Sequence, residues 1–110
     1  MQKLTAAQLD QAKQQGKRFL LVNTLDEAHF DKTNIEGAVN IPQQDDDFVE
    51  RVEKQAGGKD QPVVVYCANT ECSSSTQAAE KLEKAGFTNV YDFESGAEGW
   101  KESGHRTVGV

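Results

Sequence analysis

Apolar residues recur along the chain in short continuous runs, separated by segments with helical spacing. The runs at 19–22 and 63–66 are apolar at every position, which is typical of strands buried on both faces of a parallel sheet. Two further strands are expected at 38–41 and 89–93. Because these strands alternate with helices, the pattern predicts an α/β fold with a mainly parallel sheet and helices on both faces.

The intervening helices carry sequence signals for their starts and ends. Residues 5–8 form a capping-box sequence, and Gly16 is expected to end the helix that follows it. Apolar residues at helical spacing indicate two more helices, which are expected to end at Gly57 and Gly86. The three aspartates at 45–47 fit the start of the second of these three helices, because carboxylates stabilise helix N-termini.

The composition is that of an ordinary globular domain. The chain has 110 residues, of which 36% are hydrophobic, and this length fits one domain covering residues 1–110. No apolar run approaches the roughly 20 residues of a membrane span, and no signal peptide is apparent, so we expect a cytoplasmic protein without membrane association. The net charge is −6 and no cluster of Lys and Arg stands out, which argues against binding to nucleic acid.

The cysteine count limits the sulfur chemistry. Cys67 and Cys72 are the only two cysteines, and in a reducing cytosol they are not expected to form a structural disulfide. Two cysteines do not complete a tetrahedral zinc site, and His29 and His105 lie far from them in sequence. We therefore expect neither a metal nor any other cofactor.

Cys67 occupies a position that suits a reactive thiol. It follows the most hydrophobic strand, and a short loop then leads into a helix. Because ligands bind beyond the carboxyl ends of strands in such sheets, amide groups of the loop and helix are expected to surround its sulfur. They would lower its pKa below the ordinary value of about 8.5. The alternative is that Cys67 is simply a small apolar residue at the end of a buried strand.

At this point the sequence resembles a single-domain rhodanese over nearly its whole length. The similarity lies in NIEGAVNIP at 34–42, VVVYC at 63–67, GFTNVY at 86–91 and SGAEGW at 95–100. No single match is specific, but their order and spacing agree with the family. The resemblance implies a three-layer rhodanese-like fold, with a mainly parallel sheet and helices on both faces.

The same resemblance identifies Cys67 as the catalytic cysteine and implies a six-residue active-site loop that ends at Cys72. This loop length is the one associated with sulfur transfer, whereas related phosphatases have a longer loop closed by an arginine, where this chain has Ser73. The resemblance therefore disfavours phosphatase activity. The residues implied to bind substrate are Ala68, Asn69, Thr70, Glu71, Cys72 and Ser73.

This chain also departs from the rhodanese pattern. Many rhodaneses carry arginine in the loop, but the comparable positions here are Ala68 and Cys72, and Glu71 adds a negative charge. We therefore expect weak binding of thiosulfate and favour a persulfide or polysulfide as the sulfur donor. Upstream, Asn23 and Asn34 stand where the family usually has charged or ionisable residues, and we expect these amides to hydrogen-bond to each other or to the backbone.

The leading hypothesis is a sulfurtransferase that carries sulfane sulfur as a Cys67 persulfide and passes it to a thiol or another nucleophile. Its expected partners are a small sulfur donor and either a thiol acceptor or a protein sulfur carrier, and we expect a monomer. Cys72 is either a resolving thiol, which attacks the Cys67 persulfide and leaves a disulfide, or a small packed side chain. Two alternatives are a redox protein using Cys67 and Cys72, and a rhodanese-like binding module without activity.

Three other side chains are candidates for function and are assigned structural roles. Trp100 is expected in the core rather than as a substrate platform. His29, on a short helix, and His105, near the end of the chain, are expected to be solvated. Neither is placed beside Cys67 by the sequence, so no Cys–His pair is proposed.

Overall fold

The computed structural model describes residues 1–69 and 71–105, and within this part of the chain five strands form one sheet in the order β1-β5-β4-β2-β3. Every pairing between neighbouring strands is parallel. The strands are β1 (Gln2–Lys3), β2 (Leu20–Asn23), β3 (Val39–Asn40), β4 (Val63–Tyr66) and β5 (Val90–Phe93). The predicted mainly parallel α/β sheet is therefore confirmed.

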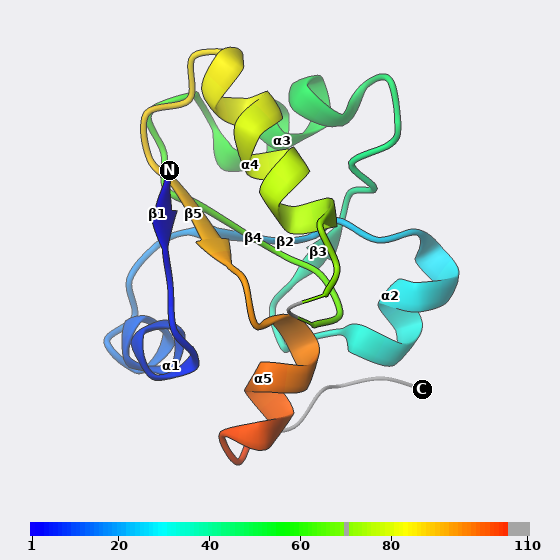
Figure 1. Cartoon of the computed structure of the whole chain (residues 1–110). Helices are drawn as coiled ribbons and strands as arrows, with labels where there is room; N and C mark the ends of the chain where they lie inside the picture. Colours follow the sequence, from blue (N-terminus) through cyan, green and yellow to red (C-terminus); the bar gives the residue numbers. More distant parts are fainter. Residues whose placement is uncertain (70, 106–110) are drawn as a thin grey trace.

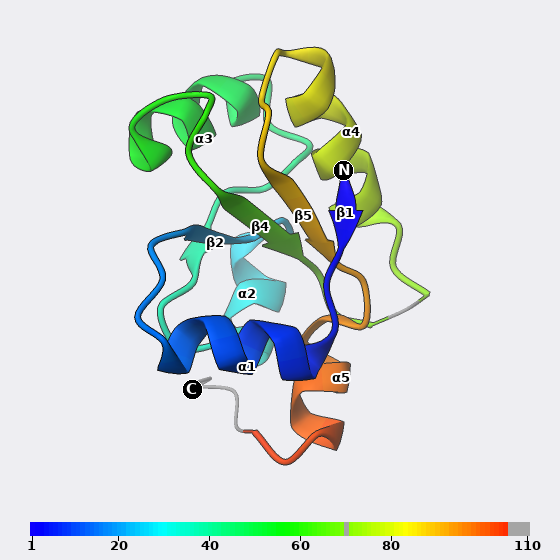
Figure 2. The same cartoon turned by 90° about the vertical axis from the view of Figure 1, so that its left-hand side faces the viewer.

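Helices cover both faces of this sheet, as Figures 1 and 2 show. The helices are α1 (Ala6–Gln14), α2 (Glu27–Thr33), α3 (Phe48–Ala56), α4 (Ser74–Lys84) and α5 (Gly96–Glu102). Helices α3 and α4 pack on one face, and α1 and α5 pack on the other. Within the described residues, no helix has both the length and the apolar content needed to cross a membrane.

Strand β4 is apolar at every position because helices cover both of its faces. Val63 and Val65 belong to the core beneath α3 and α4, whereas Val64 and Tyr66 belong to the core beneath α1 and α5. Successive side chains of a strand point to opposite faces, so a strand covered on both faces needs apolar residues throughout. All four side chains are buried.

The helix boundaries follow the signals in the sequence. Thr5 accepts a hydrogen bond from the Gln8 amide and completes the predicted capping box of α1. Helix α3 begins directly after Asp47 and ends at Gly57, which adopts the left-handed conformation. Strand β1 and helix α5 were not anticipated from the hydrophobic pattern, because β1 is two residues long and α5 contains two glycines.

The register of the sheet places three strand ends side by side. Asn23 of β2 pairs with Tyr66 of β4, and Tyr66 pairs with Phe93 of β5. The residues that follow these strands, Thr24 and Cys67 among them, therefore meet at one edge of the sheet. This carboxyl edge is where open α/β sheets bind ligands.

Candidate active site

Cys67 is the first residue after β4, and it has no exposed surface. The chain continues through a loop to α4, whose N-cap is Ser73. Both cysteines are free thiols; Cys67 is buried and Cys72 is half-buried.

Helix α5 holds the base of this loop. The amide of Ala97 donates to the carbonyl oxygen of Cys67 at 3.0 Å, and the amide of Glu98 donates to that of Ala68 at 2.8 Å. Gly96 precedes these two residues with φ of +64°, and a Cβ there would lie 3.0 Å from Ala68 O and closer still to Cys67 O. Only glycine fits this close approach without strain.

Thr24 fastens the N-terminus of α4 to the ends of β2 and β4. Its Oγ1 lies 3.2 Å from the carbonyl oxygen of Tyr66 and 3.0 Å from Ser74 Oγ. Ser74 Oγ in turn donates to the carbonyl oxygen of Thr24 at 3.2 Å. Thr24 is buried, so these bonds fix the helix without competition from solvent.

Asn69 organises the loop by accepting two of its amide hydrogens. Its Oδ1 accepts from the Glu71 amide at 3.0 Å, and its carbonyl oxygen accepts from the Cys72 amide at 3.2 Å. These two amides are therefore engaged within the loop. The expectation that the loop amides converge on Cys67 is wrong for both of them.

The groups around the Cys67 sulfur favour its protonated form. The thiol lies 3.2 Å from the carbonyl oxygen of Cys72, 3.9 Å from that of Asn69 and 3.7 Å from Ser75 Oγ. Burial and the neighbouring Cys72 thiol raise the pKa of Cys67 from 9.0 to about 11, against a smaller opposing effect of the Ser75 amide and hydroxyl. The predicted lowering of this pKa is therefore wrong.

The other residues expected in the loop lie at its surface or at its ends. Ala68 follows Cys67, Glu71 is exposed at the tip, and Ser73 caps α4. Ser73 Oγ accepts a hydrogen bond from Gln77 Nε2 at 3.1 Å. Thr70, also expected to bind substrate, lies outside the described residues.

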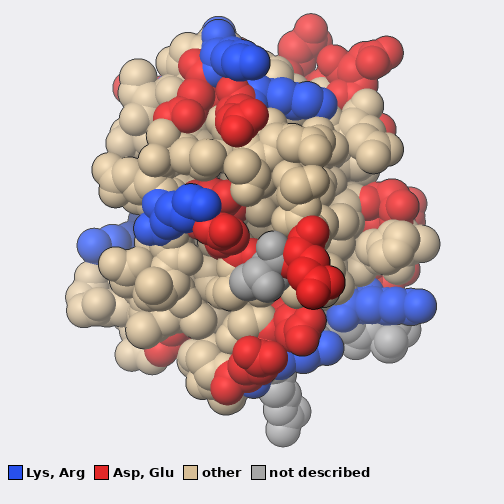
Figure 3. All heavy atoms as spheres, in the orientation of Figure 1, with Lys and Arg blue, Asp and Glu red and all other residues tan. Residues whose placement is uncertain are grey.

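Two polar pockets flank the loop. One, of about 380 Å³, has Cys72, Ser73, Ser74, Asp26 and Asp45 in its wall. The other, of about 220 Å³, lies against α5, and its carboxylates are Glu71, Glu98 and Glu102. Figure 3 shows acidic side chains gathered over this part of the surface. Neither pocket has a lysine or arginine among its described lining residues.

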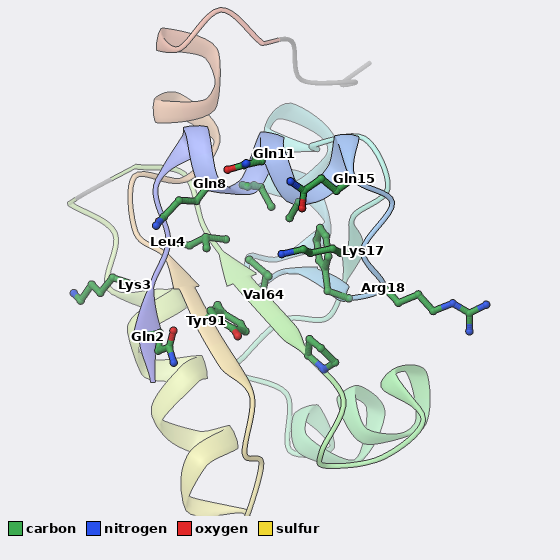
Figure 4. Close-up of a pocket in the computed structure, with 14 residues that line it drawn as sticks. Gln2, Lys3, Leu4, Gln8, Gln11, Gln15, Lys17, Arg18, Val64 and Tyr91 are labelled. Atoms are coloured by element: carbon green, nitrogen blue, oxygen red, sulfur yellow. The ribbon is translucent and has the colours of Figure 1, made fainter.

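A third pocket, of about 420 Å³, lies between α1 and the sheet, away from Cys67 (Figure 4). Its floor includes Leu4, Val64 and Tyr91, and its rim carries glutamines of α1 together with Lys17. Its described lining contains no cysteine, serine, histidine or carboxylate. We therefore place the candidate site at the loop of Cys67 and not in this pocket.

Upstream of the loop, Asn23 hydrogen-bonds to the polypeptide around it, as expected. Its Nδ2 donates to Thr33 Oγ1 at 3.0 Å and its Oδ1 accepts from the Leu25 amide at 3.0 Å. These bonds connect the end of β2 to the end of α2. The role of Asn23 is therefore structural.

Trp100 is buried and packs edge-on against Phe93, which confirms its place in the core. His29 is exposed and hydrogen-bonds to Asp26, as expected for a solvated residue. His105 departs from the expectation because it is half-buried and stacks on Trp100, with ring centroids 4.0 Å apart. Among the described residues, no group of three His, Cys, Asp or Glu side chains is arranged to hold a metal ion.

Three residues that shape the site were not identified from the sequence: Thr24, Ser75 and Gly96. Thr24 follows a buried strand, so the rule that parallel strands end at one edge was a usable signal for it. Gly96 was noted only as part of a motif, and its contact with Cys67 depends on how α5 docks. Ser75 lies one residue inside α4, where no sequence pattern specifies which side of the helix faces the sulfur.

Comparison with known proteins supports the same assignment of fold. The family model described as rhodanese-like domain matches residues 5–103. The solved rhodanese-like domain of an Anabaena protein is 27% identical, with a TM-score of 0.83 over 100% of this chain and 80% of that one. A rhodanese-related protein from Thermoplasma volcanium is 24% identical, with a TM-score of 0.74 over 96% of each chain.

A thiosulfate sulfurtransferase from Pseudomonas aeruginosa has the same fold. It is 20% identical, with a TM-score of 0.86 over 96% of this chain and only 20% of that longer one. At this level of identity the likeness concerns the fold alone.

Proposed function

Because this chain belongs to the rhodanese-like domain family, which includes sulfurtransferases, we propose that it transfers sulfane sulfur through a persulfide on Cys67. The observation that carries the proposal is the position of Cys67. Its sulfur lies buried at the carboxyl end of a central strand, beside the first turn of α4 and beneath a loop whose residues line two surface pockets. This position gives a nucleophile a helix N-terminus for charge stabilisation.

The proposed reaction has two displacement steps and needs no cofactor. The Cys67 thiolate attacks the outer sulfur of a donor R–S–SH, the S–S bond of the donor breaks, and RSH leaves with a proton. The resulting Cys67 persulfide is then attacked at its outer sulfur by an acceptor thiolate. The new S–S bond forms on the acceptor, and Cys67 leaves as a thiolate that regains a proton from solvent.

The charge around the loop favours a donor other than thiosulfate. Glu71, Glu98 and Glu102 share one flanking pocket, and Asp26 and Asp45 line the other. A dianion approaching these carboxylates meets repulsion, with no lysine or arginine in either described lining to offset it. We therefore favour a persulfide or polysulfide donor, and a thiol or a protein sulfur carrier as acceptor.

In the proposed cycle, the loop rearranges when the donor binds. With its pKa raised to about 11, Cys67 is held in its protonated form at neutral pH. The nearest acceptor is the carbonyl oxygen of Cys72, 3.2 Å from the sulfur, which stabilises the thiol and not the thiolate. Turning this carbonyl away would remove a group that opposes ionisation and would open the buried sulfur to the donor.

A second candidate function is reversible dithiol–disulfide exchange between Cys67 and Cys72. The observation that favours it is the proximity of the two cysteines within one loop, where Cys67 Sγ lies 3.2 Å from the carbonyl oxygen of Cys72 and the Cys72 thiol helps to raise the pKa of Cys67. The same proximity suits a resolving step, in which the Cys72 thiolate attacks the inner sulfur of the Cys67 persulfide and releases hydrogen sulfide. Titration of free thiols in a glutathione buffer tests the redox role, which requires reversible loss of both thiols together.

A third candidate is a rhodanese-like binding module without catalysis, which the burial and raised pKa of Cys67 favour. A measurement of sulfur transfer distinguishes this binding module from the proposed sulfurtransferase. Wild type, Cys67→Ser and Cys72→Ser are supplied with cysteine persulfide and an acceptor thiol, and transferred sulfur is measured. We expect loss of transfer in Cys67→Ser and retained loading of Cys67 in Cys72→Ser. Full transfer by Cys67→Ser would refute the proposal.

A further inference from the structure

Side chains of the first turn of α4 bond to the ends of β2 and to β5, the two strands that flank β4. Ser74 bonds to the end of β2, and Thr76 Oγ1 donates to Asp92 Oδ2 of β5 at 2.9 Å. Between them, Ser75 has no exposed surface, and its Oγ lies 3.7 Å from Cys67 Sγ. Bonds on both sides therefore set the position of Ser75 relative to the sulfur.

Ser75 offers this sulfur two hydrogen-bond donors. Its amide lies in the first turn of α4, where an N–H has no acceptor within the helix, and together with the hydroxyl it lowers the pKa of Cys67 against the larger effect of burial. Its hydroxyl rotates freely about the C–O bond, so it accepts from a thiol and donates to a thiolate. The carbonyl oxygens of Asn69 and Cys72 lack this choice, because they only accept.

We propose that Ser75 stabilises the anionic sulfur of Cys67, by donating both its amide and its hydroxyl hydrogen once the thiol has lost its proton to solvent. The inference rests on the proposed function, because this sulfur is the one that attacks the donor and later leaves the acceptor. In this proposal Ser75 keeps its position beside the Cys67 sulfur, whereas the Cys72 carbonyl group turns away from it. Because Ser75 is buried and held on both sides, only its hydroxyl hydrogen has to rotate when the sulfur becomes charged.

The test uses the Cys72→Ser background, in which Cys67 is the only thiol. The rate of alkylation by iodoacetamide is followed from neutral pH to about pH 10 in this background, and again with Ser75→Ala or Ser75→Thr added. We expect Ser75→Ala to lower the rate about tenfold, since the thiolate fraction falls, and Ser75→Thr to restore most of it. Ser103→Ala serves as the control, because that hydroxyl bonds to the Trp100 carbonyl instead.

The direction of the change separates this role from a structural one. If Ser75 merely held α4 in place, its loss would loosen the site and raise the alkylation rate of the buried thiol. An unchanged or faster rate in Ser75→Ala would overturn the inference. Thermal unfolding of each variant confirms that it is folded.

A measurement on the wild type needs no substitution at all. When Cys67 is ionised by raising the pH, we expect the amide proton of Ser75 to shift downfield in the NMR spectrum, because it donates to a more negative sulfur. No shift upon ionisation would contradict the role of Ser75 while leaving sulfur transfer intact. Failure of the wild type to load with cysteine persulfide would instead refute the proposed function, whatever the alkylation rates show.

Discussion

The thiol of Cys67 donates its hydrogen to the carbonyl oxygen of Cys72, with 3.2 Å between Sγ and O. This bond joins the two cysteines of the loop and favours the protonated form of Cys67. The chain thus has a resting state in which the candidate nucleophile is buried and uncharged. In the proposed cycle, this contact breaks before Cys67 attacks the donor.

The raised pKa of Cys67 predicts how stability depends on pH. The folded state binds this proton more tightly than the unfolded state, so its contribution is fully present below pH 9.0 and is lost as pH rises toward about 11. In this window the free energy of unfolding should fall by up to about 1.4 kcal/mol per pH unit more steeply than in Cys67→Ser. Denaturant titrations of both proteins across the window measure the difference, and equal slopes would contradict the raised pKa.

Gly96 is predicted to be the least replaceable residue of the site. In Gly96→Ala, the new methyl group meets the carbonyl groups of Cys67 and Ala68 in a backbone conformation that alanine rarely adopts. We expect a loss of about 3 kcal/mol in the free energy of unfolding, as α5 separates from the loop. Gly104→Ala is the control, since it has positive φ but open space around it. Similar losses in the two variants would show that only the backbone angle matters.

Thr24 is predicted to support the site through its hydroxyl group. Thr24→Val keeps the shape of the side chain but removes the hydrogen bond shared with Tyr66 and Ser74. We expect chemical denaturation to show a loss of about 1–2 kcal/mol, while Thr24→Ser stays near wild type. A neutral Thr24→Val would mean that the backbone bonds alone hold α4.

The choice of donor is predicted to depend on Glu71. Replacing it with arginine puts a cation at the tip of the loop, so we expect thiosulfate to become a better donor by about tenfold relative to cysteine persulfide. Glu71→Gln, which removes the repulsion without adding attraction, should fall between the two. Unchanged ratios of the two loading rates in both variants would show that charge does not set donor preference.

The sequence was sufficient for the architecture because the fold depends on local patterns. The buried strands at β2 and β4 and the capping box at Thr5 follow from side-chain periodicity and hydrogen-bond chemistry. The position of Cys67 directly after a buried strand was predicted from the same periodicity. Strand β1 was missed because two residues carry no periodic signal.

The environment of the sulfur was not predictable by the same reasoning. Whether amides or carbonyls face Cys67 depends on the rotation of single peptide groups, and Asn69 takes two of the amides for itself. The contact with Ser75 likewise depends on the exact rotation of α4 about its axis. These are tertiary features, and residue types alone do not determine them.

The most direct test is to find where sulfur resides after the protein meets a donor. Wild-type protein is incubated with cysteine persulfide, its intact mass is measured, and the modified peptide is mapped after the free thiols are blocked. We predict a gain of one sulfur atom, located on Cys67. A protein that gains no sulfur, or that carries it only on Cys72, would contradict the assignment of Cys67 as the sulfur carrier.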